Sequence, residues 1–299
     1  MKQFFAALLA LLMILTSLPT LGESVIVNRI ADPDAVCEFE EGATLLEVYF
    51  PRIYGVDAAF VRCGDYSMLI DCAGIGNMDA GVEPQWPKVL AMLQQLGVTE
   101  ITYAVNSHPD ADHIGGFNHV LKEISCGEFL LGFPEDYDAG DYIRFRVYSD
   151  LHEMGVPFRR VSHGDTLAFG DAKVTVYQRL DEAIPRVNGR SVTLMIELGQ
   201  RRIFFSGDIM TLTQKLLYED RENVDLRADI LKYPHHGYEP LNLGFLQTVN
   251  PRLCVITSGP SEAAGVEQLR DYGVKYVYTA SGALRLTTDG HVWLVERMP

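Results

Sequence analysis

The chain has 299 residues, a hydrophobic content of 47% and a formal net charge of −15. This apolar content supports a full buried core, in one large domain or two small ones. The negative charge counts against a protein whose whole surface binds nucleic acid, because such binding depends on Lys and Arg side chains that neutralise phosphates.

The first 22 residues predict a secretory signal peptide. Lys2 precedes an uncharged apolar run, and Thr20 and Gly22 supply small side chains near a cleavage point. Since the run is short for a membrane span of about 20 residues, cleavage is favoured over an uncleaved anchor. The mature chain is expected to be secreted or extracytoplasmic, with no stable membrane span. Residues 23–42 are acidic and predict an N-terminal arm that is either loose or an edge element.

Residues 43–299 predict one α/β domain. β-branched and apolar runs between turn residues indicate strands at 44–50, 57–63, 67–74, 101–106, 126–133, 157–162, 165–169, 172–180, 191–199, 201–208, 228–234, 252–259, 275–280, 283–288 and 291–298. Amphipathic runs indicate helices at 83–96, 117–125, 141–155, 210–223, 239–249 and 261–273. Strand pairs and single helices alternate in two similar halves, which predicts two sheets covered by helices.

Three polar motifs follow directly after predicted strands. The first is SHPDADHIGG at residues 107–116, the second is Asp208 in FFSGDI, and the third is His235 and His236 before Gly237. Imidazole and carboxylate side chains at alternating positions of a loop can converge on one ion, and this mixed set suits Zn²⁺, Mn²⁺ or Fe²⁺. One such motif could equally be a turn and capping network, but three in order favour a metal site.

The motifs His-x-Asp-x-Asp-His, Gly-Asp and His-His-Gly resemble, in this order, those of the metallo-β-lactamase superfamily. Within it, the chain is most similar to the hydrolase domain of ComEC-type competence proteins, in the phrases LEVYF, LIDCAG, SHPDADHIGG, NGRSVTLMIELG, FFSGDI, ADILKYPHHG and SGALRLTTDG. The resemblance runs from about residue 44 to residue 297. It implies a four-layer αββα sandwich of two mixed sheets flanked by helices, with one or two divalent ions, Zn²⁺ or Mn²⁺.

The resemblance also implies which residues form a first metal site. Asp112 and His113 would hold the ion together with one residue of the His-His-Gly pair, for which His235 is taken as the ligand and His236 as the catalytic partner. Asp208 would bridge towards a second ion.

The second implied site is richer in oxygen donors. It would contain His108 and Asp110, where Asp110 replaces the histidine that is usual in the superfamily. Asn188, in VNGRS, lies where the superfamily supplies a third histidine, and would be a weak ligand. Fewer imidazoles shift the preference of this site from Zn²⁺ towards Mn²⁺, or leave it partly occupied.

The implied mechanism is hydrolysis by a metal-activated water. Asp112 and His236 are assigned to catalysis, with His236 either donating a proton to the leaving group or only orienting its neighbour. Asp71, in LIDCAG, is expected to orient a ligand histidine. Lys232 is a candidate for supporting the ligands from behind, and both Lys232 and Arg190 would otherwise meet a substrate anion or be surface charges.

The leading hypothesis is a secreted hydrolase of phosphodiester bonds, acting as a nuclease or phosphodiesterase on a nucleic-acid or small-molecule substrate. Two departures from the ComEC-type pattern bear on the substrate: PRIYGVDA replaces the usual Gly-Gln-Gly-Asp around Asp57, and Tyr238 follows the His-His-Gly where a small hydroxyl residue is common. One alternative is a hydrolase of a cell-envelope phosphoester, a lactone or a β-lactam, since a fold does not fix a function. Another is a non-catalytic, metal-stabilised surface binding protein.

Overall fold

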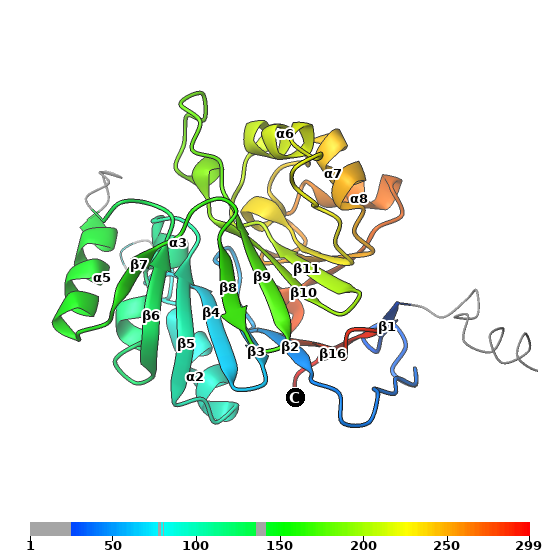
Figure 1. Ribbon diagram of the computed structural model, residues 1–299, viewed down its shortest axis with the longest axis horizontal. Coiled ribbons are helices and arrows are strands. Elements are labelled where there is room, and N and C mark those ends of the chain that lie inside the picture. The colour runs from blue at the N-terminus through cyan, green and yellow to red at the C-terminus, as the bar shows by residue number, and fades with distance from the viewer. Residues whose placement is uncertain (1–24, 77–78, 80, 136–141) are drawn as a thin grey trace, which may run out of the picture.

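The protein is a four-layer αββα sandwich (Figure 1). The structure is a computed structural model and describes residues 25–76, 79, 81–135 and 142–299. The predicted signal peptide lies outside the described residues. None of the helices in the described part of the chain is long and apolar enough to cross a membrane.

The first sheet has nine strands in the order β1-β16-β15-β2-β3-β4-β5-β6-β7. Strands β2, β3 and β4 are antiparallel neighbours, whereas β4, β5, β6 and β7 run parallel. The acidic arm contributes the edge strand β1, which pairs in parallel with β16. The bounds are β1 Ile26–Asn28, β2 Leu46–Phe50, β3 Ala58–Cys63, β4 Tyr66–Cys72, β5 Glu100–Asn106, β6 Ser125–Leu131, β7 Phe158–Arg160, β15 Leu284–Thr288 and β16 Trp293–Arg297.

The second sheet has seven strands in the order β14-β13-β12-β11-β10-β9-β8. Strands β8 to β11 pair antiparallel, and β11 to β14 pair parallel. The bounds are β8 Thr166–Phe169, β9 Ala172–Tyr177, β10 Thr193–Leu198, β11 Arg201–Phe205, β12 Ile230–Lys232, β13 Leu253–Ile256 and β14 Lys275–Tyr278.

The helices cover the outer faces of both sheets. Figure 1 shows α2 and α5 on the side of the nine-stranded sheet and α6, α7 and α8 on the side of the seven-stranded sheet. The helix predicted at 117–125 is only one turn long, because the chain must turn before it enters β6. The bounds are α2 Trp86–Gln95, α3 Ala111–Ile114, α4 Phe117–Val120, α5 Tyr142–Glu153, α6 Thr211–Glu219, α7 Leu243–Val249 and α8 Val266–Asp271, with 3-10 turns η2 Asn188–Arg190, η3 Pro234–Gly237 and η4 Thr279–Ser281.

Three separate apolar clusters fill the three interfaces between the four layers. Strand β2 contributes side chains to two of these clusters. Leu46, Val48 and Phe50 pack between the two sheets, whereas Tyr49 packs between the nine-stranded sheet and its helices. This division follows from the alternation of side chains along a strand. The predicted fold class is confirmed.

Candidate metal centre

The polar motifs meet where strands of both sheets end. Asp71 lies at the end of β4, His108 follows β5, Asp208 follows β11, His236 follows β12 and Thr257 follows β13. Strand β4 is parallel to β5, and β11, β12 and β13 are parallel to one another. Because the carboxyl ends of parallel strands meet at one edge of a sheet, residues far apart in the sequence are brought together there.

Asp112, His113, Asp208 and His236 form one compact group, in which one ligand atom from each residue lies within 4.8 Å of the others. His113 Nε2 is 3.1 Å from Asp208 Oδ2, and His236 Nε2 is 3.1 Å from Asp112 Oδ2. Three of these side chains are buried, whereas that of Asp112 is 39% exposed. Two imidazoles and two carboxylates that face one point, with one side open, suit a divalent cation.

The charges inside this group balance one another. Burial lowers the pKa of His113, but the carboxylates of Asp208 and Asp112 outweigh burial and hold that pKa well above its usual value. Burial also lowers the pKa of His236, and Asp208 and Asp57 raise it well above its usual value in the same way. Protons on the two imidazoles therefore neutralise the carboxylates in the metal-free protein. A divalent cation supplies the same positive charge when those protons leave.

His108 and Asp110 form a smaller pair beside this group. The ring centroid of His108 is 4.1 Å from that of His113, and His108 Nε2 is 3.5 Å from Asp110 Oδ2. His108 Nε2 and Asp208 Oδ1 are both buried without a hydrogen-bond partner in the described part of the chain. A buried polar atom without a partner is costly. These two atoms therefore fit the coordination of an ion, and the donor set as a whole fits one or two divalent metals.

Asp71 holds His113 from the side away from the group. Asp71 Oδ2 accepts a hydrogen bond from His113 Nδ1 at 2.9 Å. Ser107 donates to the same carboxylate from its backbone N at 2.8 Å and from its Oγ at 2.7 Å. This arrangement directs His113 Nε2 towards the group. Asp71 has a φ of 54°, a conformation that Gly, Asn and Asp adopt more readily than other residues do.

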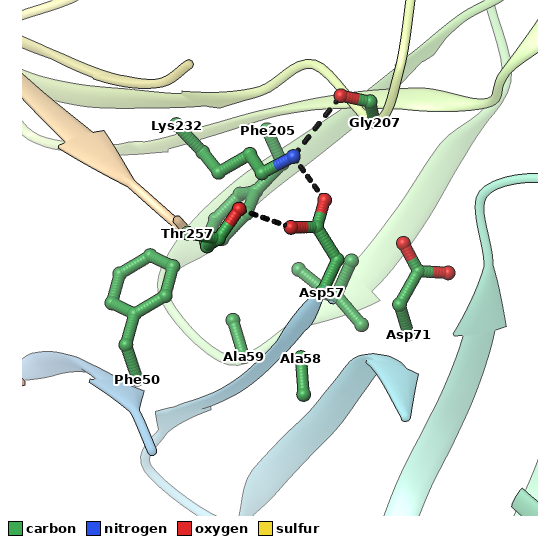
Figure 2. A pocket seen from close by; sticks show the side chains of 10 residues that line it. Phe50, Asp57, Ala58, Ala59, Asp71, Phe205, Gly207, Lys232 and Thr257 are labelled. Atoms are coloured by element: carbon green, nitrogen blue, oxygen red, sulfur yellow. Dashed lines mark hydrogen bonds and ion pairs between the residues drawn. The ribbon is translucent and has the colours of Figure 1, made fainter. Parts of the chain in front are cut away.

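Asp57 and Lys232 form a buried ion pair (Figure 2), and Asp57 also contacts His236. Lys232 Nζ contacts Asp57 Oδ2 and donates to Gly207 O at 3.1 Å, and Thr257 Oγ1 donates to Asp57 Oδ1 at 2.5 Å. His236 Nδ1 is 3.2 Å from Asp57 Oδ1 and 3.1 Å from Thr257 Oγ1. A cavity of about 20 Å³, the size of one water molecule, adjoins the pair. Asp57 and Thr257 therefore fix the ring of His236 so that its Nε2 faces the ligand group.

The ammonium group of Lys232 belongs to the buried ion pair with Asp57. Its side chain is 4% exposed, so it is not a surface charge. Its Nζ contacts Asp57 and lies 3.6 Å from Asp208 Oδ1, a position that fits the predicted role of supporting the ligands from behind. Asp57, Asp71 and His113 also form a compact group. The two acids already have partners there, in Lys232 and His113 respectively.

The two histidines of the His-His-Gly motif have different surroundings. His236 is buried in the ligand group, whereas His235 is partly exposed and its ring centroid is 5.4 Å from that of Tyr238. Burial lowers the pKa of His235, and the attraction of Asp208 does not offset it. The two histidines have φ values of 49° and 54°, a strained backbone conformation, and their ring centroids are 6.0 Å apart. The sequence-based prediction made His235 the ligand and His236 the catalytic partner, and the geometry favours the reverse.

Gly207 allows the loop of Asp208 to approach the first motif. Its φ is 50°, and a Cβ there would lie 2.8 Å from Ser191 Cβ and 3.2 Å from Ser107 Cβ. Only glycine fits this position without displacing those residues. The close approach lets Ser191 Oγ accept from Asp208 N at 3.2 Å and lie 3.3 Å from His108 Nδ1.

Asn188 is not part of the ligand group. Its carbonyl accepts a hydrogen bond from Ser191 Oγ at 2.6 Å, so this loop contributes the Ser191 hydroxyl to the site. Arg190 donates to Ile184 O from Nε at 3.2 Å and from Nη2 at 3.0 Å.

Sequence reasoning missed three hydroxyl residues that contact the predicted ligands or Asp57: Ser107, Ser191 and Thr257. Single hydroxyls have no spacing signal, although each lies at the end of a strand or beside one of the motifs.

An αββα sandwich with these residues at its strand ends defines a metal-dependent hydrolase fold. The family described as "Metallo-beta-lactamase superfamily" matches residues 52–248, which is more than half of the chain. The chain belongs to the metallo-β-lactamase superfamily, as its motifs predicted.

The chain is also similar to longer bacterial competence proteins, which confirms the ComEC-like resemblance. It is 26% identical over 262 residues to "Competence protein ComA" of Neisseria gonorrhoeae, covering 85% of this chain and 33% of that protein. It is 25% identical over 179 residues to "ComE operon protein 3" of Bacillus subtilis, covering 57% of this chain and 22% of that protein. The chain therefore spans a third or less of these relatives.

One solved structure, "CmlA, a diiron beta-hydroxylase from Streptomyces venezuelae", is similar in fold. The superposition has a TM-score of 0.50 at 13% sequence identity. It covers 89% of this chain and 55% of the CmlA chain. At this identity the similarity concerns the fold alone.

Proposed function

We propose that this protein hydrolyses phosphodiester bonds with a metal-activated water, as a nuclease or phosphodiesterase. The observation that carries the proposal is the pair of His108 and Asp110 beside the main ligand group. A carboxylate in place of an imidazole favours harder ions such as Mn²⁺ over Zn²⁺, and hard divalent ions bind phosphate oxygens. The similarity to competence proteins also supports a nucleic-acid or small phosphodiester substrate.

In this proposal Asp112, His113 and His236 would hold one ion, and Asp208 would contribute to it and to a second ion beside His108 and Asp110. When bound, such an ion would supply a nucleophile at neutral pH, because divalent ions lower the pKa of water to about 7. The partly exposed carboxylate of Asp112 can orient the attacking water by accepting a hydrogen bond. The imidazole of His235, which is partly exposed and contacts the ring of Tyr238, is available to exchange a proton with the leaving oxygen.

We also propose that the protein acts outside the cytoplasmic membrane. The support is the sequence of residues 1–22, with its basic start and apolar run. An extracytoplasmic phosphodiesterase would meet nucleic acid or envelope phosphodiesters, both of which are consistent with the proposed chemistry.

Hydrolysis of bis-p-nitrophenyl phosphate tests the proposal. Protein reconstituted with Mn²⁺ is expected to release p-nitrophenol, and Asp112→Ala is expected to reduce kcat by about 100-fold or more, as removal of a metal ligand should. The matched control is Asp65→Ala, which removes an exposed acid from the turn between β3 and β4. Elemental analysis of the as-isolated protein identifies the metal.

Equal rates in the wild type and Asp112→Ala would overturn the assignment. Cleavage of a lactone or β-lactam with no cleavage of any diester would move the protein to the alternative class of substrates. Retention of a divalent metal without hydrolysis of any of these substrates would favour the non-catalytic, metal-stabilised binding protein.

A further inference from the structure

Two hydroxyl groups face the same ring nitrogen of His108. Ser107 Oγ is 3.0 Å and Ser191 Oγ is 3.3 Å from His108 Nδ1. Ser107 follows β5 of the nine-stranded sheet, whereas Ser191 precedes β10 of the seven-stranded sheet. Val192 N donates to Ser107 O at 2.8 Å, which holds the two segments together. Both serines are buried, so water does not compete for these contacts.

The hydrogen of each hydroxyl group is committed to another oxygen. Ser191 Oγ donates to Asn188 O at 2.6 Å, and Ser107 Oγ donates to Asp71 Oδ2 at 2.7 Å. A carbonyl and a carboxylate can only accept hydrogen bonds, and two oxygen atoms this close would repel each other without a hydrogen between them. Because a hydroxyl group has a single hydrogen, both hydroxyls can only accept a hydrogen bond from His108.

The other ring nitrogen of His108 has no such acceptor. His108 Nε2 is buried without a hydrogen-bond partner in the part of the chain that the structure describes. Its distance of 3.5 Å from Asp110 Oδ2 is longer than an ordinary N–H···O hydrogen bond. A proton on Nε2 would therefore be unsatisfied, and the lone pair of Nδ1 would face two hydroxyl oxygens. A proton on Nδ1 avoids both costs.

We infer that Ser107 and Ser191 hold the neutral His108 ring in the tautomer with its proton on Nδ1, and that Ser191 is thereby a positioning residue for the second metal ion. In this tautomer the lone pair of Nε2 is free to bind a metal. The inference rests on the proposed role of His108 as a ligand and is independent of the substrate. The loop from which the superfamily supplies a third histidine thus acts here through a hydroxyl group.

Ser191 also connects His108 to the segment of Asp208. Its Oγ accepts a hydrogen bond from Asp208 N at 3.2 Å. The hydroxyl therefore donates one hydrogen bond and accepts two, which uses its full capacity. Removal of this oxygen would weaken the support of two proposed ligands of the second ion, whereas Ser107 would still accept from His108.

NMR spectroscopy of metal-free protein labelled with ¹⁵N in its histidines tests the tautomer. Long-range ¹H–¹⁵N correlations distinguish a protonated from an unprotonated ring nitrogen, and comparison with His108→Gln assigns the His108 signals. At a pH where the ring is neutral, the wild type is expected to show a protonated Nδ1 and an unprotonated Nε2. A proton on Nε2 at every pH at which the protein is folded would overturn the inference.

Titration with Mn²⁺, followed by electron paramagnetic resonance of the free ion, tests the positioning role. Ser191→Ala is expected to bind the second equivalent of Mn²⁺ about tenfold more weakly, the lower end of the effect of removing a group that supports a ligand. The first equivalent should bind nearly as in the wild type. The matched control is Asn188→Ala, which removes an amide from the same loop but keeps the main-chain carbonyl that Ser191 needs. This control is expected to bind both equivalents as the wild type does.

Circular dichroism and thermal unfolding in EDTA check that Ser191→Ala folds. An equal loss of affinity for both equivalents would make Ser191 a structural residue of the whole centre and overturn the positioning role. An unchanged affinity for the second equivalent would overturn it too, as would a wild type that binds a single Mn²⁺ ion. Because neither measurement uses a substrate, a failure of the inference is distinguishable from a failure of the proposed phosphodiesterase function.

Discussion

Lys232 and Asp57 form an ion pair in which neither side chain is more than 6% exposed. Lys232 ends β12 of the seven-stranded sheet, and Asp57 directly precedes β3 of the nine-stranded sheet. The pair therefore joins the two sheets directly behind His236. Burial lowers the pKa of Lys232, but Asp57 and Asp208 outweigh it and raise that pKa above its usual value, so the ammonium stays charged.

Lys232→Met is expected to reduce the free energy of unfolding by about 3–5 kcal/mol, because it leaves the Asp57 carboxylate buried without its cation. Urea denaturation in EDTA measures this loss without a contribution from bound metal. The matched control is Lys173→Met, whose partner Glu197 and whose own side chain are more exposed. That loss should stay within about 1 kcal/mol.

The double variant Asp57→Asn/Lys232→Met separates charge from packing. It is expected to be more stable than Lys232→Met alone, since no unpaired charge is then buried. If the losses of unfolding free energy in Asp57→Asn and Lys232→Met simply added in the double variant, the ion pair would not be important for stability.

Asp71→Asn is expected to lower the metal affinity about 10- to 100-fold, because an amide orients the imidazole of His113 less strongly than a carboxylate does. Asparagine tolerates the positive φ at this position, so the backbone should be preserved. Competition with a chromophoric chelator measures the affinity, and circular dichroism checks the fold. An unchanged affinity would show that the bond to His113 is not needed to position the ligand.

His236→Ala is expected to lower the metal affinity by more than about 100-fold, a larger effect than a change behind a ligand. His235→Ala should bind metal nearly as the wild type does, with a reduced kcat if its imidazole exchanges the leaving-group proton. Metal content and kcat, measured on both variants, test the two roles together. The reverse pattern would restore the assignment made from the sequence.

The sheets and the three motifs were predictable because their signals are local. Alternation along β2 and the spacing of residues 107–116 can be recognised without knowing the fold. The role of Asp57 could not be predicted, since it depends on contacts with Lys232 and Thr257, which lie at the ends of two other strands. The choice between His235 and His236 depends on two positive φ angles, which no periodic pattern encodes. In the VNGRS loop the sequence singled out Asn188, whereas the fold turns Ser191 towards the site.

Metal removal is expected to lower the thermal stability of the protein. An ion present at 100 times its Kd stabilises the folded state by about 2.7 kcal/mol, which corresponds to a fall in Tm of roughly 5–10 °C on adding a chelator. Differential scanning calorimetry of the wild type measures it. Asp112→Ala serves as control, and its Tm should change little with chelator. A chelator-insensitive wild type would mean that no ion is bound with useful affinity.

Glu47 provides a pH-dependent contribution to stability at a distance from the metal ligands. It lies opposite Arg62 on neighbouring strands β2 and β3 and accepts hydrogen bonds from Arg62 Nε at 2.5 Å, Arg285 Nη2 at 2.6 Å and Tyr49 Oη at 2.7 Å. Burial raises the pKa of Glu47, but the hydrogen bonds from Arg62 and Tyr49 and the charges of the two arginines outweigh burial and hold that pKa below its usual value.

Since the folded pKa of Glu47 is lowered, its stabilising effect is fully present above the unfolded value of about 4.3 and is lost as pH falls through the folded value. Glu47→Gln removes the charge and keeps the shape. We expect the wild type to exceed this variant by on the order of 1 kcal/mol in free energy of unfolding at neutral pH, and by progressively less below about pH 4. Urea denaturation at both pH values measures the difference. A difference that stays constant with pH would assign the contribution of Glu47 to packing and neutral hydrogen bonds, because only the ionised carboxylate titrates in this range.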